Sequence, residues 1–94
     1  MERLIDFLRQ AVQMDGSDVF IIPGSPVETK RNGQLMPLSE EKLTPAAAEE
    51  LIGAAYELAG RRTDALEENG DDDFSFAIKD LSRFRCNAYR QRGT

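Results

Sequence analysis

Histidine is missing from this 94-residue sequence, and cysteine occurs once, at Cys86. Without histidine, neither imidazole acid–base catalysis nor a histidine-ligated metal is possible. A single cysteine excludes an internal disulfide and any paired-thiol redox or zinc motif. This cysteine usage is typical of a reducing compartment. We therefore expect a cytoplasmic protein without a metal site.

The sequence also lacks a long apolar run and a phosphate-binding loop. Its longest apolar stretch is VFII, from Val19 to Ile22, whereas roughly 20 residues are needed to span a bilayer. The opening MERLIDFLRQ mixes charged with apolar residues and contains no secretory signal. No segment has the G-x-x-x-x-G-K-[ST] pattern of a phosphate loop. We expect no catalysis by these residues alone.

The composition present is that of one folded domain. A hydrophobic content of 40% argues against disorder, although 31% of the residues are charged. Ninety-four residues can form one core but not two, so residues 1–94 are expected to be a single domain.

Apolar spacing and breaker residues predict elements in the order α-β-β-β-α-α-β-β. A helical stripe covers residues 2–14, and a buried strand follows at 18–22. Asn32-Gly33 predicts a two-residue type I′ turn, and Pro37 predicts that the second arm of this hairpin is an edge strand. Thr44 and Pro45 open the next helix as N-cap and first helical residue.

The remaining elements are a helix end, a short helix and a second hairpin. Gly60 is expected to close the long helix, and residues 63–69 to form the short one. Residues 71–92 alternate as a hairpin that presents one apolar face. The elements together predict an α+β fold, a mostly antiparallel sheet with helices packed on one face.

Four arginines and no acid lie in the last fourteen residues of a chain whose formal net charge is −5. These arginines are Arg83, Arg85, Arg90 and Arg92. Strand alternation places Arg83 and Arg85 on the same face as Asn87 and Tyr89. The opposite face carries Phe84, Cys86 and Ala88. Because a guanidinium grips two anionic oxygens at once, the arginine face suits a phosphate-bearing ligand or an acidic partner.

Plainer interpretations of these residues remain open. Arg83 and Arg85 can simply pair with Asp71 or Asp73 on the adjoining strand, which contributes little stability. Nucleic-acid binding is not expected, because the sequence pI is about 4.7. The run from Asp71 to Asp73 is expected to be the solvated entry to a strand, and Cys86 to be a small core residue.

Three segments together resemble the N-terminal, PAS-like domain of the secretion-type ATPases that power type IV pili, in particular the PilT-type retraction ATPases. They are GSDVFI at 16–21, GSPVETKRNGQL at 24–35 and DDDFSFAIKDLSRFRCNAYRQRGT at 71–94. The resemblance covers nearly the whole chain. Phe20 stands where the family often has histidine, so no role of that imidazole is carried over.

The resemblance implies a PAS-like fold and a place in a motor. It implies that Arg85, and less directly Arg92 and Arg83, contact the phosphates of ATP. ATP and Mg²⁺ would then be bound in a longer protein, at the interface with a RecA-like domain that lies beyond residue 94. A homo-hexamer and contact with the inner-membrane platform of the pilus are implied partners.

Two other functions are compatible with the same fold. A stand-alone PAS-like module for a ligand or a protein would need a cavity behind the sheet. A simple acidic adaptor would tolerate replacement of all four arginines without consequence.

Overall fold

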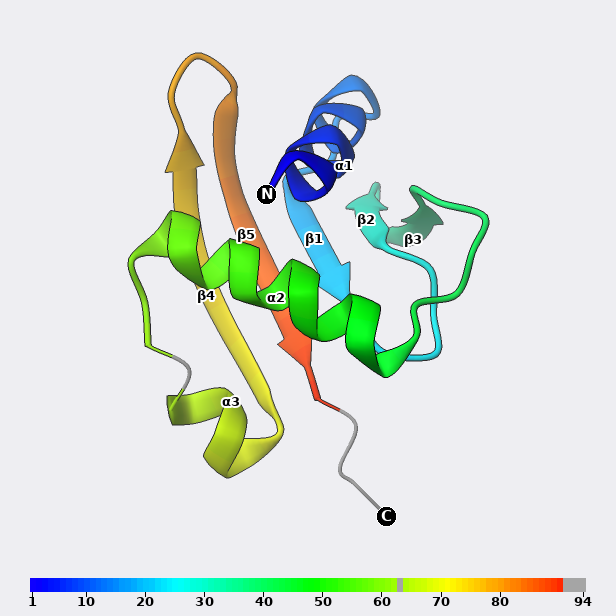
Figure 1. Ribbon diagram of the computed structural model, residues 1–94. Coiled ribbons are helices and arrows are strands. Elements are labelled where there is room, and N and C mark those ends of the chain that lie inside the picture. The colour runs from blue at the N-terminus through cyan, green and yellow to red at the C-terminus, as the bar shows by residue number, and fades with distance from the viewer. Residues whose placement is uncertain (63, 91–94) are drawn as a thin grey trace.

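The computed structural model describes residues 1–62 and 64–90. Its elements follow in the order α-β-β-β-α-α-β-β, which confirms the expected order. They are α1 (Glu2–Gln13), β1 (Asp18–Ile21), β2 (Glu28–Arg31), β3 (Gln34–Pro37), α2 (Pro45–Ala59), α3 (Asp64–Asn69), β4 (Asp71–Ile78) and β5 (Ser82–Tyr89). Figure 1 shows α1 and α2 in front of the same face of the sheet.

The five strands form one sheet in the order β3-β2-β1-β5-β4. Three of the four strand pairs are antiparallel, and the remaining pair, β1 with β5, is parallel. The sheet is therefore mostly antiparallel, as expected. The parallel pair joins the two hairpins and aligns Asp18 with Arg85 and Phe20 with Asn87.

The turns and helix caps expected from the sequence are present in the structure. The Thr44 side chain accepts a hydrogen bond of 3.1 Å from the Ala47 N–H, and Gly60 ends α2 in the left-handed conformation. Asn32 and Gly33 both have positive φ, at 51° and 81°, as a type I′ turn requires. Pro37 lies on β3, which is an edge strand.

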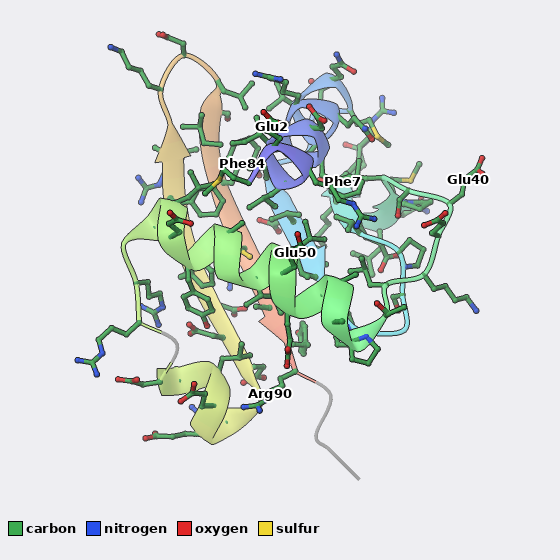
Figure 2. The ribbon with its side chains drawn as sticks, viewed as in Figure 1. Glu2, Phe7, Glu40, Glu50, Phe84 and Arg90 are labelled. Atoms are coloured by element: carbon green, nitrogen blue, oxygen red, sulfur yellow. The ribbon has the colours of Figure 1, made fainter. Side chains whose placement is uncertain are left out.

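The core lies between the helices and the covered face of the sheet. On α1 the buried side chains are Leu4, Phe7, Leu8 and Ala11. Aromatic rings line β4 and β5, where Phe74, Phe76 and Phe84 lie in successive contact at centroid separations of 6.3 and 5.9 Å. Figure 2 shows Phe84 on this inner side and Glu50 on the outer surface of α2. These rings lie in the core between the covered face of the sheet and the helices.

Candidate functional site

The face of the sheet away from α1 and α2 is covered by no other element within residues 1–62 and 64–90, and we call it the open face. On β1, β4 and β5 it carries Asp18, Phe20, Asp71, Asp73, Ser75, Ala77, Arg83, Arg85, Asn87 and Tyr89. Alternation along β5 and the register with β1 and β4 put these side chains together. This is the arginine face expected from the sequence, with two residues of β1 added to it.

Arg85 lies on the open face and is paired with an acid of the neighbouring strand. Its Nη2 atom is 3.2 Å from Oδ2 of Asp73, and the two side chains are 58% and 54% exposed. An ion pair this exposed contributes about 0–1 kcal/mol. Arg85 therefore does pair with an acid of the adjoining strand, as the plainer interpretation of the sequence expects. Because this ion pair is weak, another anion can replace Asp73 as the partner of Arg85.

Arg83 lies two residues from Arg85 on the same face and is also exposed. Its guanidinium has no hydrogen bond or ion pair within the described part of the chain. Strand alternation thus brings Arg83 and Arg85 together with two acids, Asp18 and Asp73. Asp71 also lies on the open face, so the three acids on β1 and β4 outnumber these two arginines, and the face is not a strongly positive surface. Arg92 lies outside the described residues.

Asn87 is the unexpected residue of the open face. Its neighbours across the strands are Phe20 on β1 and Asp73 on β4. The residue is only 7% exposed, and its Nδ2 atom is buried without a hydrogen-bond partner. The sequence placed Asn87 on the polar face correctly, but it contained no signal of this burial, which depends on the residues that flank it in the sheet.

Asp72 corrects the expectation that residues 71–73 are all solvated. It points to the covered face and is 9% exposed. Its carboxylate accepts a hydrogen bond of 2.8 Å from the Tyr56 hydroxyl and two from the Arg61 guanidinium, at 2.8 and 2.9 Å. These bonds join the end of α2 to the start of β4. Asp72 lies two residues before Phe74 and therefore shares its face of β4. This alternation was the feature of the sequence from which the burial of Asp72 could have been predicted.

The charges around Asp72 follow from these bonds. The Arg61 guanidinium, and then the Tyr56 hydroxyl, hold the pKa of the Asp72 carboxyl below its usual value of 3.8. Burial and the Asp72 carboxylate raise the pKa of the Tyr56 phenol. The Asp72 carboxylate is ionised, accepts hydrogen bonds on both oxygens and points away from the open face. Its role is therefore structural.

Cys86 is a core residue, as expected. It is fully buried, and burial together with the charges of Asp72 and Asp73 raises the pKa of its thiol to about 12. A thiol with such a pKa is not a nucleophile near neutral pH.

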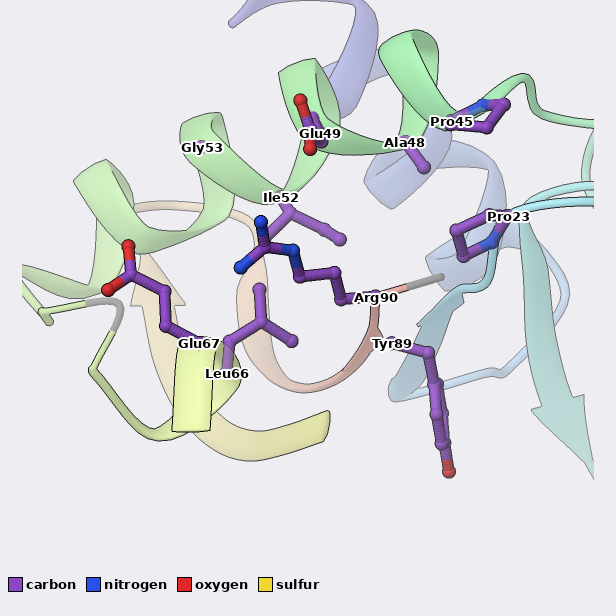
Figure 3. A pocket seen from close by; sticks show the side chains of 10 residues that line it. All are labelled: Pro23, Pro45, Ala48, Glu49, Ile52, Gly53, Leu66, Glu67, Tyr89 and Arg90. Carbon is purple, nitrogen blue, oxygen red and sulfur yellow. The ribbon is translucent and has the colours of Figure 1, made fainter. Parts of the chain in front are cut away.

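A small pocket lies where β5 leaves the sheet, between α2 and α3 (Figure 3). Its volume is about 220 Å³, and its apolar wall includes Ile52 and Leu66. Arg90 projects into it. Drug-sized ligand sites are larger, at roughly 300–1,000 Å³. The pocket therefore gives little support to a stand-alone ligand-binding module.

Within the described residues, no helix has both the length and the apolar character needed to cross a membrane. No protein-family model matches the chain. The sequence is 35% identical over 85 residues to the type IV pilus ATPase PilU of Pseudomonas aeruginosa. The matched region covers 90% of this chain and 22% of PilU. The fold matches a crystal structure of the pilus retraction motor PilT with bound ADP, with a TM-score of 0.67 and 32% identity. That match covers 96% of this chain and 26% of PilT.

The fold, its sheet order and these two similarities define a class, the PAS-like domains of pilus motor ATPases. Within that class, the chain belongs to the PilT-type family and corresponds to its N-terminal domain. The chain spans about a quarter of the length of these relatives.

Proposed function

We propose that this domain supplies arginine contacts to ATP in a type IV pilus retraction ATPase. In this proposal a RecA-like domain, from the same or a neighbouring subunit, covers the open face. Arg85 then exchanges Asp73 for a phosphate oxygen of ATP. The observation that carries the proposal is the pair of exposed guanidiniums, Arg83 and Arg85, side by side on an uncovered face.

The chemistry of these residues fits a contact to phosphate rather than a complete nucleotide site. Two adjacent guanidiniums can each hold anionic oxygens in a planar fork. The sequence contains no phosphate loop, so ATP and Mg²⁺ would be held chiefly by the RecA-like domain. Arg92 would be a further contact from the segment that follows β5.

The contact would also connect ATP hydrolysis to movement. The Arg85–Asp73 pair is exposed and weak, so it can form and break as the phosphates change. The position of this domain relative to the RecA-like domain would then follow the nucleotide state. We propose a cytoplasmic homo-hexamer that acts on the inner-membrane platform of the pilus. Similarity to the type IV pilus ATPase PilU and the pilus retraction motor PilT supports the pilus part of this proposal.

Replacing Arg85 by alanine in the full-length ATPase tests the proposal. An arginine that stabilises charge on a transferring phosphoryl group contributes about 10³–10⁵ in rate. We therefore expect Arg85→Ala to lower ATP turnover by about 10³-fold, measured by phosphate release, without loss of the fold by circular dichroism.

Arg9→Ala is the matched control, because Arg9 also has an exposed partner, Asp6 at 3.6 Å, but lies on α1. Turnover of this variant should stay within about twofold of wild type, as expected for the loss of an exposed ion pair. Near-normal turnover by Arg85→Ala would exclude the proposed contact.

A further inference from the structure

We propose that Asp73 competes with the phosphates of ATP for Arg85 and thereby restrains ATP hydrolysis. The inference rests on the proposed function, because it requires that Arg85 contacts ATP. It adds a positioning residue, which acts on hydrolysis only through the guanidinium that it holds.

The ion pair between Arg85 and Asp73 runs diagonally across two strands. The residue directly opposite Arg85 is Ser75, whereas Asp73 lies opposite Asn87. To bring its Nη2 atom within 3.2 Å of Asp73 Oδ2, the Arg85 side chain extends toward the level of Asn87. Arg83 lies two residues from Arg85 in the other direction along β5. The pair therefore directs the Arg85 guanidinium away from Arg83, although the two arginines are neighbours on the open face.

This ion pair contributes little to the stability of the fold. Both side chains are more than half exposed, and exposed pairs of this kind are weak. Asp73 differs in this respect from Asp72, whose carboxylate is buried and accepts hydrogen bonds from α2 and from the residue that follows it. The consequence of the Asp73 carboxylate therefore lies in its effect on Arg85.

The carboxylate of Asp73 opposes a contact between Arg85 and phosphate in two ways. It occupies Nη2, a terminal nitrogen of the fork with which a guanidinium grips two anionic oxygens. It also places a negative charge beside the position that the phosphate would take, and like charges in proximity disfavour binding. Without this carboxylate, Arg85 is free to turn toward Arg83, so that both guanidiniums can hold the same phosphate group.

The other charged side chains of the open face do not offset this effect. Strand β2 adds Glu28, which is aligned with Phe20, and Lys30, which has the same parity. Among the acids of this face, Asp73 is the one that forms an ion pair within residues 1–62 and 64–90. With β2 included, the face carries four acids and three cations, namely Asp18, Glu28, Asp71 and Asp73 against Lys30, Arg83 and Arg85.

The informative variant is Asp73→Asn in the full-length ATPase, because the amide keeps the shape of the side chain and removes its charge. The measured quantity is kcat/KM for ATP, from phosphate release. This quantity compares the free protein, in which the pair is formed, with the transition state, in which Arg85 holds phosphate. We expect kcat/KM to rise by about two- to fivefold, the range that corresponds to an exposed ion pair. A structural role of Asp73 would not raise it.

Asp71→Asn is the matched control. Asp71 is an exposed acid on the same strand and the same face, but it lies opposite Tyr89. Its replacement removes an equal charge and leaves the Arg85–Asp73 pair intact. We expect kcat/KM to change by less than about twofold in this variant.

Two further backgrounds test whether the effect passes through Arg85. If it does, Asp73→Asn should leave kcat/KM unchanged in Arg85→Ala, because residues that act through one contact are not additive. In Arg83→Ala the increase should persist, because Arg83 is not the partner of Asp73.

Three results would overturn the inference. An unchanged or lower kcat/KM in Asp73→Asn would show that the carboxylate does not restrain Arg85. An equal increase in Asp71→Asn would assign the effect to the total charge of the open face. An increase that persists in Arg85→Ala would mean that Asp73 acts through a different group.

The Arg85→Ala measurement separates this inference from the proposed function. Normal turnover in Arg85→Ala would remove the proposed arginine contact to ATP, and the inference with it. Strongly reduced turnover in Arg85→Ala, together with unchanged kcat/KM in Asp73→Asn, would remove the inference alone.

Discussion

Asp72 and Asp73 are neighbours in the chain but have opposite surroundings. Asp72 points to the covered face, where it accepts hydrogen bonds from Tyr56 and Arg61. Asp73 points to the open face, where it pairs with Arg85 in solvent. Removing the buried carboxylate leaves the Tyr56 hydroxyl without its partner, while removing the exposed one costs little. The same residue type is therefore structural at one position and exchangeable at the next.

We expect Asp72→Ala to lower the free energy of unfolding by about 2 kcal/mol, because hydrogen bonds to a charged group are lost and a buried hydroxyl is stranded. Asp73→Ala is the control and should change it by less than about 0.5 kcal/mol. Urea unfolding of the 94-residue chain measures both. Equal effects of the two variants would contradict the structural role of Asp72.

The Asp72 group also predicts a pH dependence of stability. The pKa of Asp72 is lower in the folded domain than its ordinary value of 3.8, so the folded state binds its proton less readily than the unfolded state. Its contribution is complete above the unfolded-state pKa and is lost as the pH falls through that value and the folded-state pKa. Urea midpoints measured between pH 7 and pH 3 should fall with acid in wild type and fall less in Asp72→Asn.

At the scale of elements, the turn between α1 and β1 is held by a close approach to β2. Gly16 is buried, and a Cβ added there would overlap the Oγ1 atom of Thr29. That hydroxyl donates a hydrogen bond of 2.7 Å to the carbonyl of Asp18. Glycine is therefore required at this turn by packing. Gly53 differs, because it lies exposed within α2 with no atom within 4 Å of an added Cβ.

Alanine should consequently have opposite effects at the two glycines. Gly16→Ala should destabilise the domain by about 1–3 kcal/mol, the usual cost of overpacking. Gly53→Ala should stabilise it by about 0.5–1 kcal/mol, because alanine is the better residue within a helix. Thermal unfolding of both variants, followed by circular dichroism, gives the comparison. A loss of stability in Gly53→Ala would mean that α2 is constrained there by something other than its own backbone.

At the scale of the whole molecule, a single core unites the three helices with the covered face of the sheet. The radius of gyration is 12.3 Å, close to the value of about 12.4 Å expected for a compact domain of this length. Cys86 lies in this core, on the parallel pair of strands. The thiol of Cys86 is therefore a reporter of opening for the domain as one unit.

We expect Cys86 in the 94-residue chain to react with a thiol reagent only through unfolding. Its labelling rate should follow the equilibrium for global opening as urea is added, because Cys86 is fully buried on an interior strand of the sheet. Rapid labelling without urea would instead reveal local opening between β1 and β5.

Much of the fold could be predicted from the sequence, because local chemistry decides it. The type I′ turn at Asn32-Gly33, the cap at Thr44 and the stop at Gly60 depend on backbone preferences of a few residues. Strand alternation was enough to assign Arg85 to one face of β5 and Cys86 to the other. These assignments were confirmed because each depends on residues close together in the chain.

Only the tertiary structure decided which strands meet and what each side chain faces. The parallel pairing of β1 with β5 puts Phe20 beside Asn87, although they are far apart in the sequence. The burial of Asn87 and the bonds of Asp72 to Tyr56 and Arg61 depend on such long-range neighbours. Burial and pKa are properties of the surroundings of a side chain, and those surroundings exist only once distant segments have packed together.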